Sequence, residues 1–261
     1  MLIAITREVS PAIGNCELTH LERRTIDVQL AQAQHHQYEE CLAALGCEVH
    51  RLPVEPDLPD SVFVEDVAIV VDELAIITRP GADSRKPETI SIARALKSYR
   101  KLFYIEAPGT VDGGDVLRVG KKIFVGLSSR SNLSAIEQMQ DVLQPYGYTV
   151  KGVQVNGCLH LKSAVTQVTV DTLLINPNWV DTRPFRDWNL IEVDALEPYA
   201  SNALLIGETV VYPASFPRTR RRLEAHGISV MTVDVSELAK AEGAVTCCSL
   251  VFSANGPEAR A

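Results

Sequence analysis

The sequence lacks long apolar runs and any excess of positive charge. No stretch approaches the roughly 20 apolar residues that a membrane-spanning helix requires. The apolar residues after Met1 are few, and no basic residues precede them as they would in a secretory signal. Asp and Glu number 33 against 25 Lys and Arg, a net charge of −8, so phosphate backbones would repel the chain. We therefore expect a cytoplasmic protein whose partners include neither nucleic acid nor a membrane.

Cysteine pairs with metal-binding spacing are also missing. The six cysteines are Cys16, Cys41, Cys47, Cys158, Cys247 and Cys248, and no two of them form a Cys-x-x-Cys pair. Three disulfides are one interpretation, but a chain of 261 residues with 46% hydrophobic residues can build its own core. We expect reduced thiols and no zinc site.

No low-complexity tract or Ser/Gly linker divides the chain, so residues 1–261 are predicted to form one α/β domain. The chain instead contains a repeat of strand, turn, strand, loop, helix and strand. Three copies are clear, in residues 67–105, 116–150 and 203–231. The helix of the second copy, residues 131–143, is indicated by Leu133, Ile136, Met139 and Leu143 at spacings of three and four.

Two further copies are less regular. One begins at residue 164, and its helix is poorly formed. The other has a strand at 2–5, a helix at 26–45 and a strand at 49–52, but its first strand would come from residues 250–252. A repeat completed by pairing the two ends of the chain predicts a closed ring of five ββαβ units, because closure leaves no bare sheet edge. An open α/β sandwich is the alternative.

A polar residue stands just before the opening strand of each unit. These residues are Glu65 with Asp66, Asp112 in the turn Asp-Gly-Gly-Asp, His160, Asn202 and Cys247. In a ring of units, equivalent loops point to one end, so these side chains should converge. Arg85 and Arg130 follow the second strand of two units and are expected at the rim of the same opening.

Each of these residues alone has an ordinary structural explanation: an inert buried cysteine, a histidine that caps a carbonyl, or a turn. Together they suggest chemistry. A cysteine can act as nucleophile, a histidine can transfer protons, and carboxylates can hold a cationic group. Arginines suit a substrate carboxylate. The combination favours an arginine-like substrate.

Seven motifs extend this pattern along nearly the whole chain. They are Leu18, 60–66 (DSVFVED), 77–81 (ITRPG) with Arg85, 112–115 (DGGD), 124–128 (FVGLS) with Arg130, 160–163 (HLKS) and 246–249 (TCCS). In this order they resemble the dimethylarginine dimethylaminohydrolases. These enzymes are a branch of the guanidino-group-modifying pentein superfamily, whose fold is a five-bladed α/β propeller of ββαβ units with pseudo-five-fold symmetry.

The resemblance implies a catalytic role for three residues. Cys247, the first of two adjacent cysteines, corresponds to the nucleophile, and His160 to the general acid and base. Asp112 stands where the family has a carboxylate that holds the histidine.

It also implies a set of substrate-binding residues. Asp66 with Glu65 would bind the guanidinium, Arg85 and Arg130 the substrate carboxylate, and Leu18 and Asp60 the α-amino end. Ala241 departs from the family, in which a larger aliphatic residue is usual. If the backbone carbonyl is the contact there, the change matters little.

The implied reaction is hydrolysis of asymmetric dimethylarginine or monomethylarginine to citrulline and an amine. It would proceed through a covalent thiouronium on Cys247, without metal or organic cofactor. The resemblance is compatible with a monomer or a homodimer.

Several alternatives stay open. Arginine deiminase and amidinotransferase belong to the same superfamily; agmatine deiminase suits the two arginines less well, because agmatine has no carboxylate. A ribosome-binding factor shares the five-fold architecture without the catalytic residues. Finally, Cys247 and Cys248 could act as a redox pair, although adjacent cysteines form only a strained ring.

Overall fold

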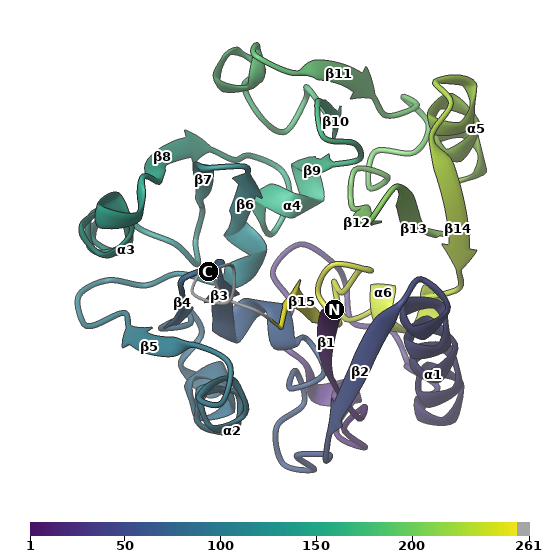
Figure 1. The fold of residues 1–261 in the computed structure, drawn as a ribbon. Helices are drawn as coiled ribbons and strands as arrows, with labels where there is room; N and C mark the ends of the chain where they lie inside the picture. Colours follow the sequence, from purple (N-terminus) through teal and green to yellow (C-terminus); the bar gives the residue numbers. More distant parts are fainter. Residues whose placement is uncertain (255–261) are drawn as a thin grey trace.

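The computed structural model describes residues 1–254, and residues 255–261 of the predicted domain lie outside the described part. Five three-stranded sheets surround a common centre (Figure 1). The sheets are β15-β1-β2, β3-β4-β5, β6-β7-β8, β9-β10-β11 and β12-β13-β14. In each of them the middle strand is antiparallel to one neighbour and parallel to the other. The predicted five-bladed α/β propeller is confirmed, and the open sandwich is excluded.

The strands are short and regular. Their bounds are β1 Leu2–Arg7, β2 Cys47–Leu52, β3 Ala68–Val70, β4 Leu74–Ile77, β5 Lys101–Tyr104, β6 Val116–Val119, β7 Lys122–Leu127, β8 Thr149–Gln154, β9 Val165–Gln167, β10 Thr172–Ile175, β11 Asn189–Glu192, β12 Leu204–Ile206, β13 Thr209–Pro213, β14 Ser229–Val233 and β15 Leu250–Ser253.

Four of the parallel strand pairs are joined through a helix, because a parallel connection must cross back over the sheet. These helices are α1 Val28–Ala44, α2 Thr89–Leu96, α3 Leu133–Leu143 and α5 Pro217–Ala225, and they lie on the periphery of the ring (Figure 1). Side-chain caps define two of the starts: Asp27 accepts from the Leu30 N–H, and Asn132 from the Ala135 N–H.

The fourth sheet has only a 3-10 turn, Arg183–Phe185, between β10 and β11. Two prolines and several Asn and Asp residues in 176–188 disfavour a helix there, so the prediction of a poor helix is confirmed. One detail of the α3 pattern is wrong. Ile136, Met139 and Leu143 are buried, but Leu133 is 62% exposed because it lies in the first turn, outside the buried stripe.

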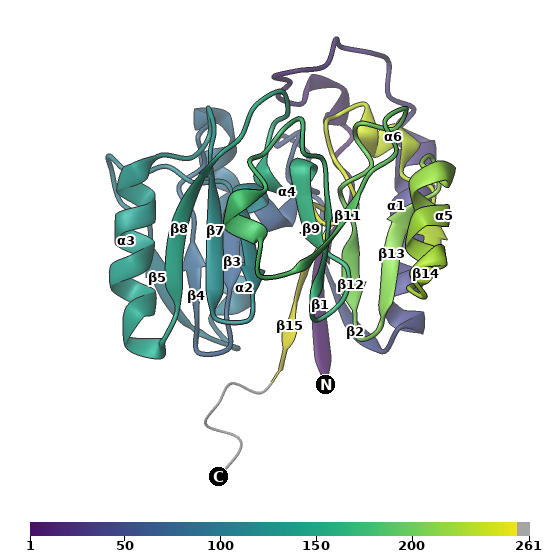
Figure 2. The same cartoon turned by 90° about the horizontal axis from the view of Figure 1, so that it is seen from above.

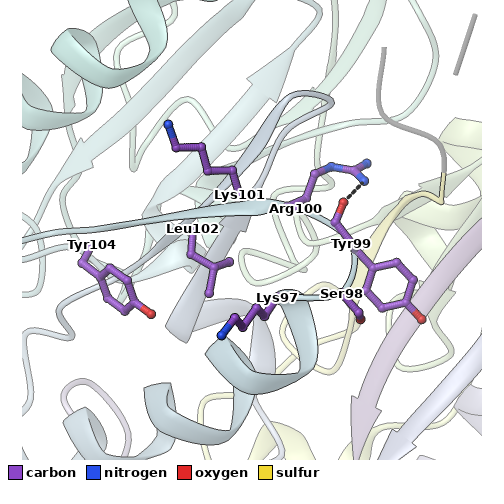
Figure 3. Close-up of a pocket in the computed structure, with 7 residues that line it drawn as sticks. All are labelled: Lys97, Ser98, Tyr99, Arg100, Lys101, Leu102 and Tyr104. Carbon is purple, nitrogen blue, oxygen red and sulfur yellow. Dashed lines mark hydrogen bonds between the residues drawn. The ribbon is translucent and has the colours of Figure 1, made fainter. Parts of the chain in front are cut away.

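The ring closes through the two ends of the chain. β15 runs antiparallel to β1, with Leu2 opposite Ser253 and Ile5 opposite Leu250. Arg100 supports this closure by donating to the carbonyls of Val71 and Ser253, at 3.0 and 2.5 Å. A surface hollow of about 550 Å³ lies beside Arg100, at the turn between α2 and β5 (Figure 3). The Arg100 guanidinium donates to backbone carbonyls, and Lys97 and Lys101 also line this hollow.

The two ends of the ring differ. The segment between β1 and α1 and the short helix α6, Ser236–Ala239, gather at one end, whereas the N-terminus lies at the other (Figure 2). Among residues 1–254, no helix is both long and apolar enough to cross a membrane.

Candidate active site

The loops that precede the first strands meet in a small, nearly closed cavity of about 20 Å³. Seven of the predicted site residues line it: Asp60, Asp66, Arg85, Arg130, His160, Ala241 and Cys247. The predicted convergence is observed for Asp66, His160 and Cys247, which lie up to 181 residues apart in the chain. Asp112 contacts His160 without lining the cavity, and Glu65 and Asn202 do not line it.

Local structure aims these side chains inward. A short helical turn stands directly before three of the first strands: Val64–Val67 before β3, Gly113–Asp115 before β6, and α4, Leu161–Ala164, before β9. Gly114 is required in this packing, because a Cβ there would lie 2.5 Å from His160 Nδ1 and 2.8 Å from Asp66 Oδ1. Because glycine has no Cβ, the loops that carry Asp66 and His160 can pack closely against Gly114.

His160 is held between two carboxylates. Its Nε2 lies 3.1 Å from Asp112 Oδ2, and its Nδ1 lies 3.8 Å from Asp66 Oδ1. Burial alone would lower the pKa of the imidazole, but these carboxylates raise it to about 9. The histidine is therefore protonated at neutral pH and can deliver a proton.

Asp66 is ionised. Burial favours its neutral form, but His160 and Arg85 outweigh burial and lower its pKa. One oxygen accepts from Arg85 Nη1 at 2.6 Å, and the other accepts from the Gly114 N–H at 2.9 Å. Asp66, Asp112 and His160 also offer three ligand atoms within 4.8 Å of one another, a spacing that a metal ion could use. The hydrogen bond from Arg85 already neutralises part of this cluster.

The structure corrects the predicted rim position of Arg85. Its side chain is only 4% exposed, and its guanidinium contacts Asp66, Glu88 and the carbonyls of Asp60 and Phe63. These contacts raise the pKa of Arg85 well above its usual value despite burial. It thus forms part of the cavity wall.

Arg130 lies closer to the opening, although its side chain is only 10% exposed. Its Nη2 donates to Thr19 Oγ1 at 3.0 Å, and its Nη1 lies 3.9 Å from Asp112 Oδ2. Thr19 lies two residues after the lining residue Glu17, so Arg130 connects this segment to Asp112.

Glu65 does not line the cavity, and its contact with the guanidinium stays a prediction. Its carboxylate accepts from Lys162 Nζ at 2.6 Å and from Thr246 Oγ1 at 2.8 Å. It faces a second hollow of about 230 Å³, which is lined by residues from the first strands. The reason is positional, because consecutive residues of the turn point in different directions and only Asp66 points to the cavity.

Cys247 is a protonated thiol in this structure. Burial, Glu65 and Asp66 all raise its pKa, because each disfavours the thiolate. Cys248 is fully buried, and its Sγ lies 3.4 Å from the Ala244 carbonyl oxygen. All six cysteines are free, as expected for reduced thiols.

Of the two residues predicted to bind the α-amino end of the substrate, only one lines the cavity. Asp60 lines the cavity and accepts from the Glu17 N–H at 3.1 Å, whereas Leu18 is half-buried and packs against the core. Burial raises the pKa of Asp60.

Four lining residues lie outside the motifs quoted from the sequence: Glu17, Leu159, Glu242 and Gly243. A fifth, Phe63, lies within the motif 60–66 but had been given no role. Gly243 must be glycine, since a Cβ would lie 2.2 Å from the Phe63 ring. Glu242 has a φ of 58°, which is unusual for a residue other than glycine. No sequence signal marks either position beyond their proximity to Ala241.

Known proteins share this chain's sequence and fold. The family model for N,N dimethylarginine dimethylhydrolase, eukaryotic, matches residues 18–252. The N(G),N(G)-dimethylarginine dimethylaminohydrolase of Pseudomonas aeruginosa is 38% identical over 228 residues, which cover 87% of this chain and 90% of that protein. The enzyme of the same name from Streptomyces coelicolor is 38% identical over 248 residues, which cover 95% of each chain.

Solved structures of known proteins have the same fold as this chain. The Pseudomonas aeruginosa enzyme, as a cysteine-to-serine mutant complexed with citrulline, has a TM-score of 0.92 at 36% identity, covering 95% of this chain and 98% of that chain. The N-terminal domain of ArgZ, a cyanobacterial arginine dihydrolase, has a TM-score of 0.84 at 16% identity, covering 96% of this chain and 98% of that chain; it shares the fold alone. The chain belongs to the dimethylarginine dimethylaminohydrolase family and is a hydrolase of the pentein superfamily.

Proposed function

We propose that this enzyme hydrolyses Nω-methylated arginines to citrulline and methylamine or dimethylamine, with Cys247 as the nucleophile. One observation supports this most strongly. Cys247, the protonated His160 and the ionised Asp66 line one cavity, where a guanidinium on Asp66 would lie close to both the thiol and the proton donor. Two relatives carry the name dimethylarginine dimethylaminohydrolase.

The charge balance suggests how the thiol is activated. Without substrate, burial and the carboxylates of Glu65 and Asp66 raise the pKa of Cys247. A guanidinium bound to Asp66 adds a positive charge beside the sulfur and favours the thiolate. The nucleophile would then form only when its target is present.

The covalent step starts when the Cys247 thiol releases its proton to solvent and the thiolate attacks the guanidinium carbon. His160 donates its proton to the departing amine, the C–N bond breaks, and a thiouronium stays on Cys247. The neutral imidazole then takes a proton from water as the hydroxyl adds to the same carbon. The C–S bond then breaks, the thiolate takes up the proton of the new hydroxyl, and the ureido group of citrulline is released with the Cys247 thiol restored. Asp112, 3.1 Å from Nε2, holds the ring throughout.

Recognition of the amino-acid end follows from the remaining charges. Asp60 suits the α-ammonium group, and Arg130, near the opening, suits the carboxylate. Phe63, Leu159 and Gly243 offer no side-chain acceptors to the cavity. A methylated nitrogen, which has fewer donors than a free one, fits such a wall.

The test is citrulline release from asymmetric dimethylarginine, monomethylarginine, arginine and agmatine under identical conditions. We expect the highest kcat/KM for a methylated arginine and poor turnover of arginine. A clear preference for arginine with release of ammonia would make the enzyme a deiminase and disprove the proposal.

A further inference from the structure

Asn202 belongs to the five-fold polar set but, like Glu65 and Asp112, it does not line the catalytic cavity. Equivalent loops of the other units contribute Asp66, His160 and Cys247 to that cavity. Asn202 is 4% exposed, and its side chain contacts the residue before the nucleophile, Thr246.

The amide of Asn202 holds Thr246 by two atoms. Oδ1 accepts from the Thr246 N–H at 3.1 Å, and Nδ2 donates to Thr246 Oγ1 at 3.0 Å. The backbone N–H can only donate, so its position fixes which end of the amide is oxygen. The Thr246 hydroxyl receives a hydrogen from Nδ2, so it donates its own to Glu65 Oε2, 2.8 Å away.

The same amide reaches the histidine loop. Nδ2 also donates to the carbonyl of Lys162 at 3.2 Å, two residues after His160. Lys162 Nζ donates to Glu65 Oε1 at 2.6 Å, which completes a closed ring of Asn202, Thr246, Glu65 and Lys162. Every bond in this ring has one donor and one acceptor.

The ring connects three units of the propeller to the turn that carries Cys247. Glu65 adds a further link, since its backbone N–H donates to the Cys247 carbonyl at 3.2 Å. On the other side, Tyr38 of α1 donates to the Val245 carbonyl at 2.8 Å. Asn202 and Glu65 both contact the nucleophile turn and Lys162, but only Asn202 bonds to the backbone of the histidine loop, at the Lys162 carbonyl.

From this geometry we infer that Asn202 is a positioning residue that sets the nucleophile turn against the histidine loop. The inference rests on the proposed roles of Cys247 and His160. A displacement of about 1 Å between reacting groups costs about 100-fold in rate. The amide touches neither the cavity nor the substrate, so the loss should fall on kcat.

The test compares Asn202→Ala with a matched control, Asn176→Ala. Asn176 is also a buried asparagine; it makes two side-chain hydrogen bonds, to the Asn178 N–H and the Pro198 carbonyl, one fewer than Asn202, and it does not line the cavity. Both variants should lower the unfolding temperature. Only Asn202→Ala should lower kcat, by roughly 10- to 100-fold, while KM stays within about threefold.

Two additional variants test the individual hydrogen bonds of Asn202. Asn202→Asp is isosteric and keeps the acceptor for the Thr246 N–H, so it should fold and still lose kcat, because it lacks the donor to the Lys162 carbonyl. Thr246→Val removes only the hydroxyl. Combined with Asn202→Ala, it should cost little more than Asn202→Ala alone, because the two residues act as one unit.

Cys247→Ser, measured in parallel, distinguishes failure of the positioning role of Asn202 from failure of the proposed function. If Cys247→Ser is inactive while Asn202→Ala and Asn202→Asp keep wild-type kcat, the positioning role is wrong and the proposed function stands. Equal kcat losses in the Asn202 and Asn176 variants would also overturn it. Turnover by Cys247→Ser would overturn the proposed function and this inference together.

Discussion

Arg85 donates a hydrogen bond of 2.6 Å to Asp66, and both side chains are buried. Removing the guanidinium would leave Asp66 and Glu88 without their cation in a low-dielectric site. We predict that Arg85→Ala lowers the free energy of unfolding by about 3–5 kcal/mol and also reduces kcat/KM. Urea unfolding and steady-state kinetics would measure both.

We expect Arg130→Ala to behave differently from Arg85→Ala. The Arg130 guanidinium lies nearer the opening and makes one hydrogen bond, to Thr19. We expect it mainly to raise KM, since a carboxylate contact binds ground and transition states about equally. A selective loss of kcat with unchanged KM would rule out the carboxylate contact.

The two adjacent cysteines should behave differently. Cys247 lines the cavity, whereas Cys248 is fully buried beside the Ala244 carbonyl. We predict that Cys247→Ser loses at least about 1,000-fold in kcat, and that Cys248→Ser stays active with a stability change of about 1 kcal/mol. Peptide mass mapping of a trapped adduct would identify the modified residue, and an adduct on Cys248 would contradict the assignment.

His160 should make stability depend on pH. Its pKa of about 9 lies above the unfolded value of roughly 6.5. The cation therefore contributes stability that is fully present below pH about 6.5 and is lost as pH rises through about 9, up to roughly 3 kcal/mol. Unfolding free energies at pH 7 and 9.5 should differ more in the wild type than in His160→Asn. Equal differences in the two proteins would show that the histidine is not a buried cation.

Gly114 should be intolerant of a methyl group. A Cβ there would collide with His160 and Asp66, neither of which can move without losing its partners. We predict that Gly114→Ala lowers kcat by about 100-fold. Gly14→Ala is the control, because nothing lies within 4 Å of its added Cβ. Similar kinetics for the two variants would mean that the His160 loop adapts easily.

Glu242, which lines the cavity, holds residues 19–21, just after the lining residue Glu17. Its carboxylate accepts from three consecutive N–H groups, of Thr19, His20 and Leu21, at 3.0, 2.5 and 2.6 Å. Its positive φ costs of order 1 kcal/mol, so Glu242→Gly would relieve strain while removing the carboxylate. We predict that both Glu242→Gly and Glu242→Ala raise KM about tenfold, since each loses charge-assisted hydrogen bonds of roughly 1.5–3 kcal/mol. If Glu242→Gly alone restored wild-type KM, strain rather than the carboxylate would be the relevant feature.

The repeat and most of the site could be predicted from the sequence. Strand and helix periods follow from side-chain spacing along the chain, so Ile136, Met139 and Leu143 indicated α3 without knowledge of any neighbour. The equivalent positions of Asp66, Asp112, His160 and Cys247 before four first strands predicted convergence, because the equivalent loops of a closed ring share one end.

Only the tertiary structure decided what each side chain faces. Glu65 and Asp66 are adjacent in the chain, yet one pairs with Lys162 and the other lines the cavity. Arg85 became part of the buried wall because Glu88, one helical turn away, meets it there. The contacts of Glu242 and Asn202 span 223 and 44 residues of sequence. Local pattern determines which elements form, but burial and partners depend on packing between units that the sequence places far apart.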